Sequence, residues 1–142
     1  MGKKRIIKAG GQESGNQSKS ASRGTKKKIE HGTLHINSTY NNTTMLLSDE
    51  KGNAVMWSSS GSLGFKGAKK GTPFAAGKVA EMLADKAIAA GLKEIDIIVK
   101  GVGAGRESSI RSFISKGVGI ASIKDKTPVP FNGPKAPKPR RV

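Results

Sequence analysis

The fold is decided by residues 72–109, which read TPFAAGKVAEMLADKAIAAGLKEIDIIVKGVGAGRESS. Thr72 and Pro73 predict a helix start, because a threonine side chain can cap a helix and proline suits the first helical position. The predicted helix runs to about Ala90, and Gly91 ends it. Its apolar residues recur at helical spacing and form one stripe: Ala76, Val79, Ala80, Leu83, Ala87 and Ile88.

A short apolar run follows this helix, so residues 95–99 predict a strand, with Asp96 as its one polar side chain. Three glycines then lead into a second predicted helix over residues 106–116, which Gly117 ends. Residues 118–123 predict another strand. The result is two strand-helix-strand units, and such units make right-handed crossovers between parallel strands.

Upstream of this stretch the pattern changes to a period of two, which is typical of strands. Three strands are predicted, over residues 33–40, 43–48 and 54–57. Asn41-Asn42 supplies a tight turn between the first two. Residues 58–71 are too polar and too rich in glycine for either regular state, so we expect one long loop. The order β-β-β-α-β-α-β predicts an α/β fold with a mixed five-stranded sheet and flanking helices.

The chain of 142 residues has a formal charge of +16, and most of this charge lies in its two ends. Residues 1–28 carry nine basic side chains against one acidic one, and residues 128–142 carry four basic and no acidic side chains. The middle carries 13 basic and 9 acidic side chains, a net charge of +4. We expect a disordered basic arm over 1–28, a globular domain over 29–127, and an extended basic tail over 128–142, where five of the six prolines fall.

The composition excludes several classes of protein. A compact chain this basic repels itself, so a polyanionic partner explains the charge most simply. The absence of cysteine removes disulfides, cysteine-based zinc sites and thiol nucleophiles. No run of about 18 apolar residues occurs, so we expect no membrane partner, and no secretory signal pattern is present.

Two segments have the residue types of a phosphate-binding site. Loop 64–71 combines glycines with three lysines, and it precedes a helix start, whose partial positive charge favours anions. Within it, Phe65 could stack on a base or fold back on the core, and the residues leave both open. The glycine turn at 101–105 opens a helix whose first turn carries Arg106. That turn matches neither the dinucleotide-binding nor the Walker A pattern.

Catalysis and metal binding find little support. His31 and His35 are four residues apart, and no third ligand lies near them in sequence. Asp96 is the one carboxylate in a predicted strand, whereas a two-metal nuclease needs several. We therefore expect no enzyme, no metal and no cofactor. A histone-like DNA-compacting protein and a degenerate nuclease stay as alternatives to an RNA-binding protein.

Taken together, the motifs from residue 31 to the end resemble the universal S-eleven family of small-subunit ribosomal proteins, in its bacterial form. The matching pieces are HINSTYNNT (35–43), GNA (52–54), GFKG (64–67), TPFAA (72–76), KGVGAGRES (100–108), TPVP (127–130), NG (132–133) and RRV (140–142). Two departures are Phe131 and Pro134, where the family usually has histidine and cysteine, so contacts of those side chains do not transfer. The glycine turn also lacks the prolines that are common in the family.

The resemblance implies a ribonuclease-H-like fold used without catalysis. It implies a structural protein that bridges helices of the 16S-type rRNA on the platform of the small subunit and helps form the cleft for the Shine-Dalgarno duplex. Its implied neighbours are the S-seven and S-eighteen proteins and initiation factor three, in a cytoplasmic or an organellar ribosome. The expected rRNA-binding residues, to which we add Arg111 of the second helix, are Asn41, Asn42, Gly64, Phe65, Lys66, Gly67, Lys69, Lys70, Gly101, Gly103, Gly105, Arg106, Asn132, Lys135, Lys138, Arg140 and Arg141.

Overall fold

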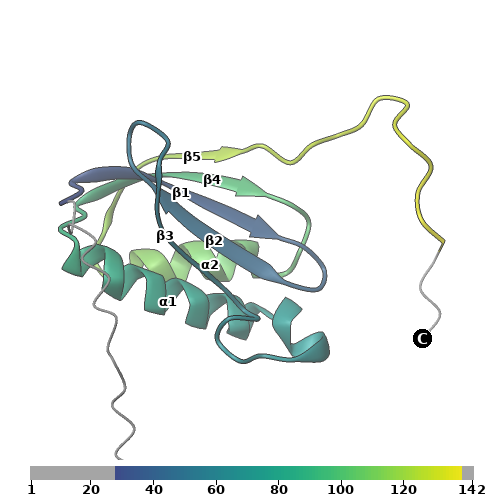
Figure 1. Cartoon of the computed structure of the whole chain (residues 1–142), viewed down its shortest axis with the longest axis horizontal. Helices are drawn as coiled ribbons and strands as arrows, with labels where there is room; N and C mark the ends of the chain where they lie inside the picture. The colour runs from purple at the N-terminus through teal and green to yellow at the C-terminus, as the bar shows by residue number, and fades with distance from the viewer. Residues whose placement is uncertain (1–27, 139–142) are drawn as a thin grey trace, which may run out of the picture.

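The computed structural model describes residues 28–138, and its helices and strands follow the predicted order (Figure 1). The strands are β1 His31–Ser38, β2 Thr43–Ser48, β3 Ala54–Ser59, β4 Glu94–Lys100 and β5 Gly119–Asp125. The helices are the short 3-10 helix η1 Gly67–Gly71, α1 Pro73–Ala89 and α2 Gly105–Ile114. None of these described helices is both long and apolar enough to cross a membrane.

The five strands form one mixed sheet in the order β3-β2-β1-β4-β5. β1 pairs antiparallel with β2, and β2 with β3, because short turns join these strands. β1 pairs parallel with β4, and β4 with β5, because the connections before β4 and β5 contain α1 and α2. The predicted α/β class and mixed five-stranded sheet are confirmed.

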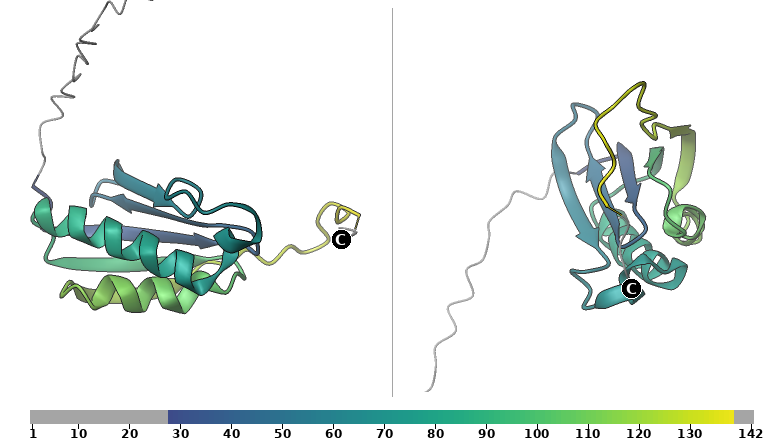
Figure 2. Two further views of the ribbon diagram at one scale, coloured as in Figure 1. Left: turned by 90° about the horizontal axis from the view of Figure 1, so that it is seen from below. Right: turned by 90° about the vertical axis from the view of Figure 1, so that its right-hand side faces the viewer.

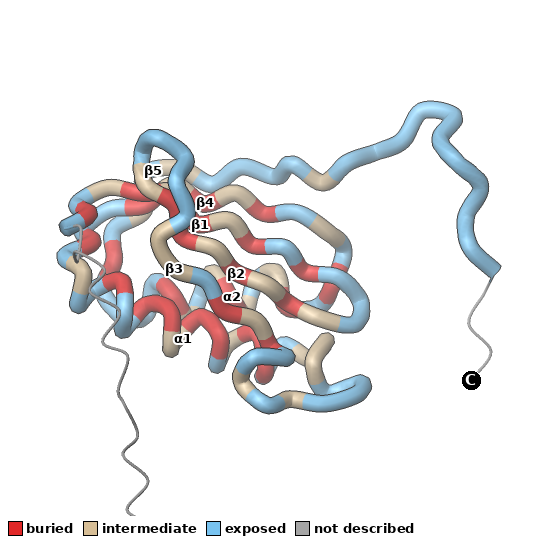
Figure 3. Tube along the Cα trace, viewed as in Figure 1, coloured by how far each residue is buried: buried red, intermediate tan, exposed pale blue. Residues whose placement is uncertain are grey.

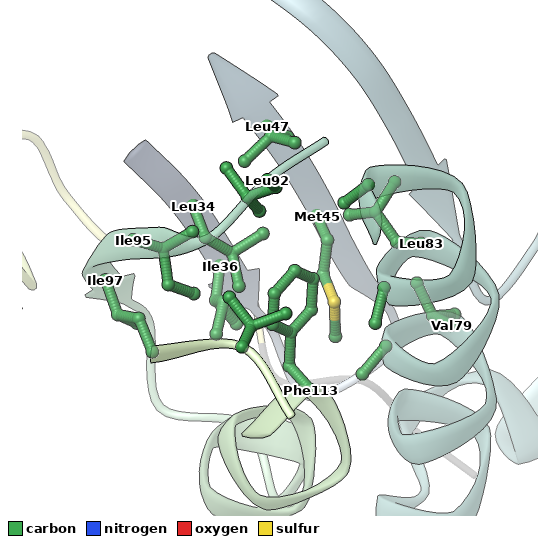
Figure 4. Packing of buried hydrophobic residues seen from close by; sticks show 14 of the residues in the cluster. Leu34, Ile36, Met45, Leu47, Val79, Leu83, Leu92, Ile95, Ile97 and Phe113 are labelled. Atoms are coloured by element: carbon green, nitrogen blue, oxygen red, sulfur yellow. The ribbon is translucent and has the colours of Figure 1, made fainter. Parts of the chain in front are cut away.

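Both helices lie on one face of the sheet, as the view from below in Figure 2 shows, and the core lies between them and the strands. Buried and less buried residues alternate along β1, where Leu34 and Ile36 point into the core (Figure 3). From the helices, Val79, Leu83 and Phe113 meet them and are fully buried (Figure 4). Burial of one such side chain contributes about 1.5–3 kcal/mol, so this face holds the fold together.

The opposite face of the sheet carries no helix in the described part of the chain, and we call it the open face (Figure 2). Strand pairing places one row of side chains across it: Trp57, Leu46, His35, Ile98 and Lys124. Trp57 is 63% exposed in this row. Parallel strands are usually covered on both faces, so an open face beside β4 and β5 is unusual.

The helix start predicted from Thr72 and Pro73 is confirmed. The Thr72 side-chain oxygen accepts a hydrogen bond from the backbone N–H of Ala75 at 3.3 Å, and Pro73 is the first helical residue. At the other end, the chain passes Ala90 and turns at Gly91, whose φ of 94° suits glycine.

The structure shifts most strand boundaries and those of α2 by one or a few residues, and three differences have a clear form. β1 ends at Ser38 rather than at residue 40, because the Thr39 hydroxyl hydrogen-bonds to the backbone N–H and C=O of Asn42 and closes a turn. Residues 58–71 are not irregular throughout, since β3 extends to Ser59 and η1 forms at their end, where Thr72 N–H donates to the carbonyl of Lys69. α2 begins at residue 105 and ends at 114, earlier than predicted at both ends.

The two predicted basic ends are only partly within the described residues. Of the arm, residues 1–27 lie outside them, and so do residues 139–142 of the tail, including the candidate residues Arg140 and Arg141. Residues 126–138 lead away from the sheet beyond β5 and contain neither helix nor strand (Figure 1).

Candidate nucleic-acid interface

The candidate segments that lie far apart in sequence gather at one end of the sheet, which we call the loop end. It consists of residues 39–42, 60–72, 101–104 and 126–138 (Figure 1). Backbone hydrogen bonds join its parts: Gly103 N–H donates to the carbonyl of Ser38 at 2.9 Å, and Ser60 N–H to that of Thr43 at 3.0 Å. Both helices also begin at this end, so their partial positive charges point the same way.

The glycines of the turn before α2 allow it to pack against the β1-β2 hairpin. Gly101 has a φ of 102°, and a Cβ there would overlap the carbonyl oxygen of Ser38. A Cβ at Gly105 would lie 2.6 Å from the Thr43 hydroxyl oxygen. Gly103 and Gly105 are buried, so they serve the close packing of the turn against the hairpin. Their contact with rRNA stays a prediction.

Arg106 forms hydrogen bonds and an ion pair with other residues of the chain. Its guanidinium donates to the carbonyl of Gly101, to the Thr127 hydroxyl at 3.2 Å, and to the carboxylate of Asp125. The Thr127 hydroxyl in turn donates to Asp125 Oδ1 at 2.6 Å and accepts from the N–H of Gly101 at 3.2 Å. These four residues, which we call the tail clamp, fix the start of the tail against the glycine turn.

The electrostatics of the tail clamp follow from these bonds. Hydrogen bonds from the Thr127 side chain, then from Arg106 and the Thr127 backbone N–H, lower the pKa of Asp125 from 3.8 to about 2. The carboxylate is therefore charged at neutral pH and pairs with the guanidinium. Arg106 has its main partners within the chain, which the sequence alone did not indicate, and its contact with rRNA stays a prediction.

Lysines without a carboxylate partner gather at and beside the loop end. No acidic side chain lies within ion-pair distance of any of these lysines in the described residues: Lys66, Lys69, Lys70, Lys100, Lys124, Lys126, Lys135 and Lys138. Away from the loop end, Lys93 pairs with Glu30 and Lys116 with Asp85, whereas Lys51 and Lys86 form no ion pair with a described residue. The sequence analysis did not name Lys100, Lys124 and Lys126 as candidate rRNA-binding residues. Lys100 could have been found from its place at the end of β4, and Lys124 from the alternation of faces along a strand.

The aromatic candidate Phe65 packs on a second aromatic ring. Its ring meets Phe74 edge to face, with 6.1 Å between centroids, and Phe74 is itself 67% exposed. Lys78 lies over the Phe74 ring at 5.8 Å. The sequence analysis missed Phe74, the residue after Pro73. An exposed ring beside lysines suits stacking on a base, so Phe74 joins the candidate residues.

The remaining candidates are exposed to different degrees. Asn41 is exposed at the tip of the hairpin, whereas Asn42 is half-buried and its Nδ2 donates to the Thr44 hydroxyl at 3.4 Å. Arg111 is exposed on α2 and forms a surface pair with Glu107 at 3.5 Å. In the tail, Lys135, Lys138 and Asn132 are exposed, and Asn132 has a φ of 53°.

The histidines and Asp96 lie away from the loop end or on the open face. His31 is near Glu50 at 3.7 Å and Asp96 at 3.6 Å, and Asp96 accepts a hydrogen bond from Ser122 at 2.5 Å. His35 contacts Ser48. Within the described residues, no group of three or more His, Cys, Asp or Glu side chains could hold a metal ion.

An α/β domain with unpaired lysines, an exposed aromatic ring and two helix starts at one end belongs to the class of nucleic-acid-binding proteins. The family model of ribosomal protein S11 matches residues 32–141, and the chain belongs to this family. Its members are structural, non-enzymatic proteins of the small ribosomal subunit that bind small-subunit rRNA. The resemblance noted from the motifs is thereby confirmed, and the ribosome is the place where the protein works.

Proposed function

We propose that the loop end is the rRNA-binding surface and that it bridges two segments of rRNA. The observation that carries the proposal is the gathering of unpaired lysines there, since phosphate contacts from lysine dominate affinity for nucleic acids. The lysines form two groups. Lys66, Lys69 and Lys70 lie in the loop beside α1, whereas Lys100 and Lys126 lie on the side of β4 and β5 (Figure 1).

Two separated groups of cations suit two RNA helices that would otherwise repel each other. We propose that these helices belong to the platform of the small subunit, next to the cleft for the Shine-Dalgarno duplex. The S-seven and S-eighteen proteins and initiation factor three are the neighbours that we propose, in a cytoplasmic ribosome. The proposed domain limits are 29–127 for the folded part and 128–142 for a tail that extends along RNA.

The test measures the salt dependence of binding to small-subunit rRNA for a triple variant of Lys66, Lys69 and Lys70 to alanine. We expect the log-log slope to fall by about 2–3, because each lost phosphate contact removes about 0.7–0.9. The matched control changes Lys51, Lys86 and Lys93 to alanine, which removes the same charge away from the loop end. Equal slopes for the two triple variants would contradict the proposal, since net charge alone would then drive binding.

A further inference from the structure

We propose that the open face holds one unpaired nucleotide of the rRNA, in a hollow between β1, β4 and the residues after β5. The hollow has a volume of about 350 Å³ and is lined by His35, Ile36, Asn37, Ile98, Lys100 and Lys126. This inference rests on the proposed function, because it assumes that rRNA lies against the adjoining loop end. The hollow adds a site that recognises a base, whereas the loop end contacts phosphates.

Strand pairing fixes the walls of the hollow. In the parallel register of β1 and β4, Asn37 lies beside Lys100, and His35 lies beside Ile98. The backbone N–H of Lys126 donates to the carbonyl of Val99 at 2.9 Å, which holds Lys126 at the rim. The backbone positions of these residues are therefore set by the sheet before any ligand binds, and only the exposed side chains remain to be ordered on binding.

The chemistry of the lining suits a nucleotide. The exposed side-chain amide of Asn37 makes no hydrogen bond to other described residues, and an amide offers a donor and an acceptor to a base edge. Ile98 gives the base an apolar contact. Lys100 and Lys126 have no acidic partner among the described residues and can contact the phosphate.

Other ligands match the hollow less well. The two carboxylates of β4, Glu94 and Asp96, lie nearer the opposite end, and Asp96 is hydrogen-bonded to Ser122. No acidic side chain lines the hollow. The positive charge of Lys100 and Lys126 therefore favours an anionic ligand. A small inorganic anion would use the lysines but neither the amide nor the apolar wall, and single-stranded RNA uses all three. The hollow also adjoins the proposed rRNA surface, which brings unpaired nucleotides to it.

The experiment uses the full chain and transcribed small-subunit rRNA, with two variants. For the double variant of Lys100 and Lys126 to alanine, we expect the salt slope to fall by about 0.7 for each lost contact, as for single strands. For Asn37→Ala we expect binding about fivefold weaker at an unchanged slope, because one neutral hydrogen bond is lost. Chemical probing of the complex should then show one unpaired base that the original chain protects and Asn37→Ala exposes.

The control changes Lys51 and Lys93 to alanine, and urea midpoints check that every variant folds. An unchanged slope for the Lys100 and Lys126 variant, or a base reactivity that Asn37→Ala leaves unchanged, overturns the nucleotide site. If Asn37→Ala leaves the base reactivity unchanged but both lysine variants lower the slope, the nucleotide site fails and the proposed function stands. If only the triple variant of Lys66, Lys69 and Lys70 lowers the slope, binding by the loop beside α1 stands, and the bridge to a second RNA segment fails together with the nucleotide site. If no loop-end variant lowers it, the proposed function fails as well.

Discussion

Replacing Gly101 by alanine tests whether the glycine turn serves packing. Gly101 has a φ of 102°, and a Cβ there would overlap the carbonyl oxygen of Ser38, so the substitution adds backbone strain and a clash with backbone atoms. The strain of a left-handed residue costs about 1–2 kcal/mol. Overpacking costs about 1–3 kcal/mol more. We therefore expect the free energy of unfolding to fall by about 2–5 kcal/mol.

Gly91→Ala is the matched control, because it separates the two costs. Gly91 has nearly the same φ, 94°, but a Cβ there would have no atom within 4 Å. Its replacement adds only the backbone strain, about 1–2 kcal/mol. The difference between the two variants measures how tightly the turn packs on β1.

Urea unfolding followed by circular dichroism measures both variants, with an unchanged m-value as the sign that only stability changed. We expect a difference of about 1–3 kcal/mol between the two variants. Each kcal/mol lowers the melting temperature by roughly 4–8 °C. If Gly101→Ala is no less stable than Gly91→Ala, the turn does not depend on close contact with Ser38. The glycine pattern would then be better explained by ligand binding than by packing.

Two further predictions concern stability. Phe113→Ala removes a fully buried ring between the helices and the sheet, so we expect the free energy of unfolding to fall by about 3–5 kcal/mol in urea titrations; a loss below about 1 kcal/mol would contradict its place in the core. The lowered pKa of Asp125 stabilises the fold above pH 3.8, and this contribution is lost as the pH falls through about 2. The difference in stability between the original chain and Asp125→Asn should therefore vanish near pH 2, and a difference independent of pH would argue against the tail clamp.

Local sequence patterns predicted the elements because the physical causes are local. The cap at Thr72, the proline after it and the glycine at 91 act within one turn of helix, and the alternation in β1 reflects which face each residue presents. The predicted end of β1 was wrong because a side-chain hydrogen bond closes the turn earlier. Thr39 closes the hairpin by its own hydroxyl, which ends β1 two residues before the predicted end.

The candidate site depended on contacts that no local pattern encodes. Arg106 meets Asp125 from 19 residues away, after α2 and β5 have brought the two together, so its role in the tail clamp could not be predicted from the glycine turn. Phe65 and Phe74 meet only because η1 folds the loop back toward α1. In the same way, sheet order rather than sequence order places Lys100 beside Asn37.

The distribution of ion pairs links stability to binding. Lysines at the loop end have no acidic partners among the described residues and repel one another, whereas Lys93 and Lys116 at the opposite end are paired. Repulsion weakens the free protein, and a polyanion that binds only the folded state adds about 2.7 kcal/mol at a concentration of one hundred times Kd. Of the two segments with the residue types of a phosphate-binding site, the one around the glycine turn and Arg106 thus serves the fold. The lysines of the other segment, loop 64–71, have no acidic partner among the described residues and stay the candidates for contact with rRNA.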